Sequence, residues 1–208
     1  MFFFTTLFAD VGCGKGGFLL NLAKQRQEEE EGSKDGEQTN EKRNYLGLEI
    51  RPSVAQYAKG RITRRNLDGV IDFVGCNANV DLDRLLSRYT CNGGGEIALL
   101  SIQYPDPHFK KSHQKRRVVT PELVDVLAKY VLPGREIFIQ SDIKDVLDAM
   151  RLTIREDGAK YFTDVIQNVD EYMDINPIGV PTEREVSVLD QNLPVYRTVF
   201  RRTDIKKE

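Results

Sequence analysis

Short apolar runs alternate along this chain with longer stretches in which apolar residues recur every three or four positions. The short runs predict buried strands and the periodic stretches predict helices, because side chains repeat every second residue in a strand and about every 3.6 residues in a helix. The predicted strands cover residues 7–11, 45–49, 70–74, 97–102, 136–140, 161–165 and 195–200. The predicted helices begin after the glycines near residue 17 and then cover residues 54–66, 81–89, 122–130 and 143–155. We expect Pro133 and Gly134 to end the fourth of these helices.

The order of these elements predicts the fold. Strands and helices alternate through the first five strands, which indicates right-handed crossovers and a parallel sheet. The last two predicted strands follow one another, which indicates an antiparallel pair that closes the sheet. At 208 residues, the chain is predicted to be a single α/β domain, residues 1–208, with ligands bound at the carboxyl ends of its strands.

One polar segment interrupts this pattern. Residues 28–43 contain seven acids, three bases and no apolar residue, so they cannot bury enough surface to order themselves. We expect a disordered surface insertion there. Without it the net charge of the chain would change from −2 to +2, so the folded part is predicted to be mildly basic.

Composition narrows the class of protein. With 40% hydrophobic and 30% charged residues, the sequence is typical of an intracellular soluble protein, and no apolar run reaches the length of a membrane helix. Met1–Ala9 is hydrophobic but short and lacks a cationic start, so no targeting signal is predicted in it. Cys13, Cys76 and Cys91 lack the spacing of metal ligands, which indicates reduced thiols and no metal site.

A glycine-rich turn follows the first predicted strand. Gly12, Gly14 and Gly17 lie between a strand and a helix, an arrangement that lets backbone N–H groups approach a nucleotide. This pattern alone fits both NAD and S-adenosylmethionine. Asp10 lies two residues before Gly12, where it is placed to bind a cationic amino group, which favours S-adenosylmethionine.

Polar residues at the ends of the next two strands fit the same site. Glu49 ends the second predicted strand, where a carboxylate can accept hydrogen bonds from ribose hydroxyls. Asn77 and Ala78 follow the third strand, where Asn77 is suited to an adenine edge. Asp10 and Glu49 could instead be ordinary strand-end acids.

The end of the fourth strand carries the strongest candidate for catalysis. Pro105 and Pro107 restrict the backbone on both sides of Asp106, which predicts a firmly positioned acid. A cationic cluster follows and is suited to the phosphates of a nucleic acid; it consists of Lys110, Lys111, Lys115, Arg116 and Arg117. The alternative is a solvated basic surface.

Six segments in this order resemble the tRNA (guanine-N7-)-methyltransferases: residues 10–16, 45–51, 105–111, 113–117, 141–142 and 182–185. The resemblance spans nearly the whole chain. It implies a class I methyltransferase with a Rossmann-like sheet of seven strands and S-adenosyl-L-methionine as cofactor. It also implies tRNA as partner, with a variable-loop guanine methylated to 7-methylguanosine.

The resemblance also assigns residues to the site. Those implied to line the methyl donor's site are Gly12, Glu49, Ile50, Asn77, Ala78 and Gln103, beside the Asp10 and Gly14 discussed above. Asp106 is implied to be the catalytic acid. Those implied to contact the substrate are Lys110, Asp142, Thr182, Glu183, Arg184 and Glu185, with phosphate contacts expected from Lys111, Lys115, Arg116 and Arg117. Asp142 could instead cap the helix that follows it.

Guanine N7 chemistry agrees with this assignment. N7 already presents an in-plane lone pair, so methylation needs alignment and charge stabilisation rather than a base. Exocyclic-amine methyltransferases resemble one another in an acid or amide followed by two prolines and an aromatic residue, which residues 105–108 do not match. A tRNA-binding protein without catalysis and, on the three glycines alone, an NAD-dependent oxidoreductase remain as alternatives.

The resemblance extends to one branch of the family. Residues 101–104 and 176–185 look most like the cyanobacterial and plastid branch, which implies a monomer or homodimer without a partner subunit. Nuclear members pair with a WD-repeat protein, and this alternative stays open. Family members share a segment ahead of the first strand that Met1–Thr6 does not match. An incomplete N-terminus would be compatible with a chloroplast address upstream, and a native start with the cytoplasm or nucleus.

Overall fold

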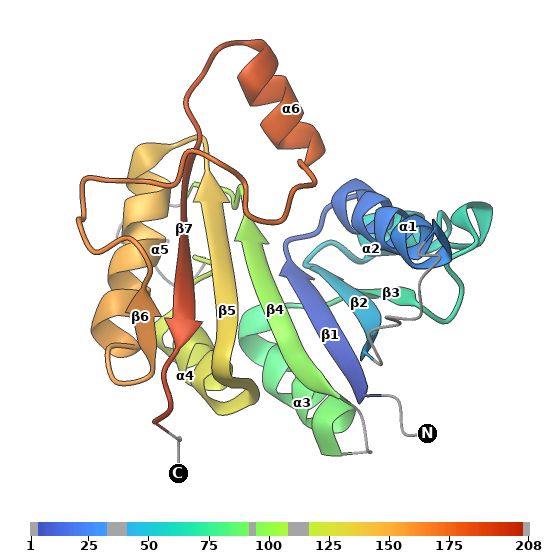
Figure 1. Ribbon diagram of the computed structural model, residues 1–208, viewed down its shortest axis with the longest axis horizontal. Coiled ribbons are helices and arrows are strands. Elements are labelled where there is room, and N and C mark those ends of the chain that lie inside the picture. Colours follow the sequence, from blue (N-terminus) through green and yellow to red (C-terminus); the bar gives the residue numbers. More distant parts are fainter. Residues whose placement is uncertain (1–3, 33–40, 92–94, 108–116, 206–208) are drawn as a thin grey trace.

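The computed structural model describes residues 4–32, 41–91, 95–107 and 117–205, and its strands form one seven-stranded sheet (Figure 1). The strands are β1 (Phe4–Val11), β2 (Glu41–Glu49), β3 (Ile71–Gly75), β4 (Glu96–Gln103), β5 (Val131–Ser141), β6 (Phe162–Asp164) and β7 (Tyr196–Arg202). They lie in the order β3-β2-β1-β4-β5-β7-β6. Neighbours from β3 to β5 pair in parallel, whereas β7 is antiparallel to both β5 and β6. The predicted α/β class with an antiparallel closing strand is confirmed.

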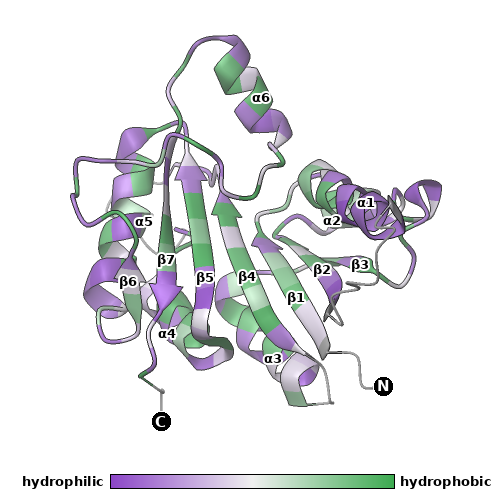
Figure 2. Cartoon of the chain, in the orientation of Figure 1, coloured by the Kyte–Doolittle hydropathy of each residue, from purple (hydrophilic) through white to green (hydrophobic). Residues whose placement is uncertain are grey.

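Helices pack on both faces of this sheet. They are α1 (Gly17–Gly32), α2 (Pro52–Lys59), α3 (Ala78–Cys91), α4 (Pro121–Tyr130) and α5 (Lys144–Asp157). A further helix, α6 (Glu183–Asp190), lies beyond the carboxyl ends of β4 and β5 (Figure 1), and a short 3-10 helix lies at Thr63–Arg65. Alternate residues of β1 separate two cores: Leu7 and Ala9 pack in the core that includes α3, α4 and α5, and Phe8 packs in the core with α1. Figure 2 shows mostly hydrophobic residues along β4, a hydrophobic middle of β5 between hydrophilic positions, and a largely hydrophilic α1. Within the described ranges, no helix has the length and apolarity to cross a membrane.

The expected disordered insertion at residues 28–43 is wrong at both of its ends. Helix α1 continues through Gly32, and its exposed polar part carries Lys24–Glu28 and Arg26–Glu29 ion pairs at helical spacing. Strand β2 already begins at Glu41 because β1 starts at Phe4 and pairs with it. The remaining residues, 33–40, lie outside the described ranges.

The structure also corrects three other elements. The predicted helix 54–66 ends at Lys59, and the 3-10 helix follows after Gly60. Helix α4 ends at Tyr130, and β5 begins at once with Val131. Pro133 and Gly134 therefore lie inside β5, where the pairing register with β4 shifts between Ile97 and Leu99 and leaves room for residues outside the ladder. Helix α6 was not predicted.

Candidate active site at the carboxyl ends of the strands

The carboxyl ends of β1, β2, β3 and β4 border a cleft with a volume of about 480 Å³. Parallel strands place their following loops at one edge of the sheet, so segments far apart in sequence meet there. The cleft brings together seven of the predicted site residues: Gly12, Gly14, Glu49, Ile50, Asn77, Ala78 and Asp106. Sequence reasoning did not single out Val11, Leu48, Arg51, Cys76, Asn79, Tyr104 or Val118, which also line it.

The glycine turn after β1 leaves open space on the side of the cleft. Gly12 and Gly14 have φ angles of 84° and 55°, which favour glycine, and a Cβ at either position would meet no atom within 4 Å. The Gly12 N–H donates to the Leu48 carbonyl at 2.8 Å, which fixes the turn against the end of β2. A ligand can therefore approach the backbone of this turn closely.

Glu49 is a buried carboxylate at the wall of the cleft. Its Oε2 accepts from the Gly14 N–H at 3.1 Å, and its Oε1 accepts from the Arg51 N–H at 3.0 Å and from Arg51 Nε at 2.9 Å. Burial alone would raise the pKa of Glu49, but the hydrogen bonds and charge of Arg51, together with the Gly14 N–H, hold it below its usual value. Glu49 is therefore ionised at neutral pH and suited to accept from ligand hydroxyls.

We call the side of the cleft lined by Val11 and Tyr104 its floor. Asp10 and Gln103, both predicted to contact a cofactor, precede these two residues in the sequence, are buried and do not line the cleft. Asp10 Oδ1 accepts from Ser101 Oγ at 2.5 Å and from Gln103 Nε2 at 3.3 Å. Burial raises the pKa of Asp10 to about 6, although these two hydrogen bonds oppose the shift. The two residues support the cleft from beneath.

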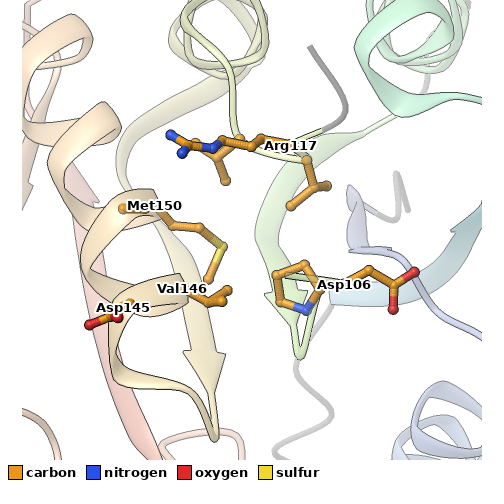
Figure 3. Close-up of a pocket in the computed structure, with 9 residues that line it drawn as sticks. Asp106, Arg117, Asp145, Val146 and Met150 are labelled. Atoms are coloured by element: carbon orange, nitrogen blue, oxygen red, sulfur yellow. The ribbon is translucent and has the colours of Figure 1, made fainter. Parts of the chain in front are cut away.

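Asp106 lies in the loop after β4, and its side chain is exposed in the cleft. The chain turns at Tyr104, whose φ of 50° is uncommon for a residue other than glycine, and Pro105 follows. Figure 3 shows the Asp106 carboxylate pointing away from Val146 and Met150 of α5, across a second cavity of about 30 Å³. The loop thus directs the acid toward the cleft and away from α5.

Asn79 holds the opposite rim of the cleft. Its Nδ2 donates to the carbonyls of Arg117 and Val118 at 3.2 and 3.3 Å, and its Oδ1 accepts from Thr120 Oγ1 at 2.8 Å. These bonds attach the start of α3 to the segment before α4. Arg117 lies there, next to the small cavity of Figure 3. The other predicted cations, Lys110, Lys111, Lys115 and Arg116, lie outside the described residues.

The motif Thr182–Glu185 forms the start of α6 and lies outside the lining of the cleft. Thr182 Oγ1 accepts from the Glu185 N–H at 3.0 Å and caps the helix. The Glu185 side chain is buried, whereas Arg184 is exposed and donates to Asp142. A Cβ on Gly17 would overlap Glu183 Oε1, so that carboxylate packs directly against the first turn of α1.

Asp142 does not cap the helix that follows it. Helix α5 begins at Lys144 after Ile143, and no side chain caps it. The Asp142 carboxylate instead pairs with Arg184. The alternative role considered for Asp142 is therefore wrong, and the residue joins the end of β5 to the start of α6.

Two solved structures share this architecture. An rRNA methylase from Streptococcus thermophilus has a TM-score of 0.54 at 12% identity, with 96% of this chain and 87% of that chain covered. An S-adenosylmethionine-dependent O-methyltransferase from Thermotoga maritima has a TM-score of 0.52 at 14% identity, covering 97% and 61%. At these identities the likeness shows the fold alone, which this chain shares with solved methyltransferases.

Sequence comparison identifies the family. A family model described as "Putative methyltransferase" matches residues 35–198. A tRNA (guanine-N(7)-)-methyltransferase of Prochlorococcus marinus (strain MIT 9313) is 38% identical over 198 residues, 95% of this chain and 75% of that protein. The protein of the same name from Synechococcus elongatus is 39% identical over 196 residues, 94% and 81%. The chain belongs to the tRNA (guanine-N7-)-methyltransferase family.

Proposed function

We propose that this chain transfers a methyl group from S-adenosylmethionine to N7 of a guanine in the variable loop of tRNA. The observation that carries the proposal is the shared cleft, in which the exposed acid Asp106 faces the same space as the glycine turn and Glu49. The names of the relatives support the choice of tRNA and of the guanine N7 atom.

The residues of the cleft suit the methyl donor. Gly12 and Gly14 leave space beside the backbone, and Glu49 offers a charged acceptor for ribose hydroxyls. Ile50, Asn77 and Ala78 would hold the adenine, with the exposed apolar side chain of Ile50 covering the ring. When bound, the donor supplies a methyl group on a positively charged sulfur. Asp10, below the floor, adds negative charge near its amino group.

Asp106 would act on the guanine rather than on the donor. Its carboxylate accepts hydrogen bonds from the N–H edge of the base, which aligns the N7 lone pair with the methyl group. The same carboxylate opposes the positive charge that develops on the ring as the bond to N7 forms. No proton needs to be removed from N7. The firm backbone at Tyr104 and Pro105 keeps this acid in place.

The tRNA would contact the rim around this acid. Asp142, Glu183 and Arg184 lie at the junction of β5, α1 and α6, whereas the side chains of Thr182 and Glu185 hold that junction from within. We assign the phosphate contacts to the cationic segment, Lys110, Lys111, Lys115, Arg116 and Arg117, by its position after Asp106 in the sequence.

We also infer that the chain acts as a monomer or homodimer without a WD-repeat partner. The relatives that support this are cyanobacterial. Methyl transfer to tRNA by the purified chain alone would agree with it. Activity that appears only after a WD-repeat subunit is added would contradict it.

Calorimetric titration tests the donor site. We expect S-adenosylhomocysteine to bind and NADH to give no heat of binding. Glu49→Ala should weaken S-adenosylhomocysteine by about 1–3 kcal/mol, because a charged acceptor for the ribose is lost. Glu136→Ala is the matched control, since that acid pairs with Arg201 on the sheet away from the cleft. Binding of NADH alone would overturn the proposal in favour of an oxidoreductase.

A further inference from the structure

A series of four buried side chains, linked by hydrogen bonds, crosses the sheet from β1 to α6. Asp10 lies on β1, Gln103 on β4, Gln140 on β5 and Glu185 on α6, and each is less than a tenth exposed. Strands β1, β4 and β5 are neighbours, and Gln103 and Gln140 are direct partners in the ladder. Their side chains therefore project on the same face of the sheet and can reach each other.

Gln140 joins the two halves of this series of side chains. Its Nε2 donates to Gln103 Oε1 at 2.7 Å and to Glu185 Oε2 at 3.0 Å. Both partners are acceptors, which fixes the orientation of the Gln140 amide, because its oxygen could satisfy neither. Gln103 then turns its own Nε2 toward Asp10. A continuous series of hydrogen bonds thus connects the floor of the donor cleft to the Thr182–Glu185 motif.

Burial of the Gln140 amide at this position costs free energy. Gln140 is fully buried, and its Oε1 has no hydrogen-bond partner among the described residues. An apolar side chain of similar size would leave Gln103 Oε1 without the Gln140 donor, whereas Glu185 would keep donors from Asn176 and Arg197. The residue is therefore poorly explained by packing or by the stability of the Glu185 carboxylate.

We propose that Gln140 is a positioning residue that links the donor site to the α6 motif, so that donor binding and tRNA binding strengthen each other. This inference rests on the proposed function. A donor whose amino group lies near Asp10 would stabilise the arrangement that the structure shows, in which Gln103 Nε2 donates to Asp10 and Gln103 Oε1 accepts from Gln140. Gln140 then holds Glu185, and with it the start of α6, in the arrangement that tRNA would meet.

The test measures how tRNA changes the affinity for S-adenosylhomocysteine, by calorimetry with and without saturating tRNA. Coupling between two sites is reciprocal, and we expect the parent to bind S-adenosylhomocysteine about 5-fold or more tightly when tRNA is present. In Gln140→Met, which keeps the shape but removes both polar atoms, the ratio should fall to within about 2-fold. Asn176→Ala is the matched control, because it removes another donor to the same Glu185 oxygen without breaking the connection to Gln103.

Each outcome separates the inference from the proposed function. Loss of coupling in Gln140→Met with retention in Asn176→Ala supports the inference. Retention of the parent's ratio in Gln140→Met, or equal loss in both variants, would overturn it. A parent that binds both ligands independently would overturn it as well and leave the proposed function intact, whereas a parent that binds no S-adenosylhomocysteine would overturn both. If Gln140→Met fails to fold, Gln103→Met interrupts the same series of hydrogen bonds between Asp10 and Gln140. This variant must then also lose the coupling between tRNA and S-adenosylhomocysteine.

Discussion

The pKa values of two strand-end acids, Asp10 and Glu49, are shifted in opposite directions. Glu49 is ionised because Arg51 and the Gly14 N–H donate to both of its oxygens. Asp10 is fully buried and receives two donors on a single oxygen, which does not offset the loss of water around it. The sequence showed two acids at equivalent positions, but the difference between them depends on partners as distant in sequence as Ser101.

Replacement of Asp10 by asparagine should change how stability depends on pH. The ordinary pKa of this carboxyl is 3.8, and its pKa in the folded protein is about 6. Between these two pH values the folded protein therefore holds a proton that the unfolded protein has already lost. The parent's free energy of unfolding should therefore decrease from about pH 4 to about pH 6, by up to roughly 3 kcal/mol from this group. Asp10→Asn cannot titrate, and its Oδ1 can keep both hydrogen bonds, so its stability relative to the parent should rise over that window.

Urea denaturation at several pH values measures this difference. Asp68→Asn is the control for removal of an acid, because Asp68 is exposed. A difference between Asp10→Asn and the parent that stays constant from pH 4 to pH 7 would contradict the buried, proton-binding state of Asp10.

Helix α6 is the helix that the hydrophobic pattern of the sequence does not predict. The segment Thr182–Glu185 was interpreted only as a substrate motif, although a threonine followed three residues later by glutamate also marks a helix start. In the structure Thr182 makes its half of that capping pair, while the Glu185 side chain turns inward to Gln140 and Arg197. The segment Thr182–Glu185 therefore carries two signals, a substrate motif and a helix start, and only the first was recognised from the sequence.

Removal of this cap should loosen α6 locally. Thr182→Ala loses the acceptor for the Glu185 N–H, which typically costs about 1 kcal/mol of helix stability. Amide hydrogen exchange in the first turn of α6 should then accelerate by about 5-fold, since exchange follows the local opening free energy. Thr182→Ser keeps the hydroxyl and should exchange like the parent. Unchanged exchange in Thr182→Ala would show that packing, rather than the cap, holds the helix start.

For the whole molecule, topology explains what could be predicted. Glu49 ends β2, and Gly12, Asn77 and Asp106 follow β1, β3 and β4. Parallel strands bring their carboxyl ends to one edge of the sheet. The connection from Gln103 through Gln140 to Glu185 could not be predicted, because buried amides look like any other polar residues until distant elements pack. The same holds for the contact between Glu183 and Gly17, on two different helices.

Single-turnover methyl transfer to tRNA tests the central claim most directly. The labelled product is treated with borohydride and aniline, which cut tRNA at 7-methylguanosine, and the rate constant is compared among the parent, Asp106→Ala and the control Asp145→Ala on the far side of the small cavity. We expect cleavage at one variable-loop guanine. The rate constant of Asp106→Ala should be at least about 100-fold lower than that of the parent, because the contact of Asp106 with the guanine strengthens as charge develops. The affinity of this variant for tRNA should change little. Labelled tRNA that resists cleavage, or an Asp106→Ala rate constant equal to the parent's, would contradict the account.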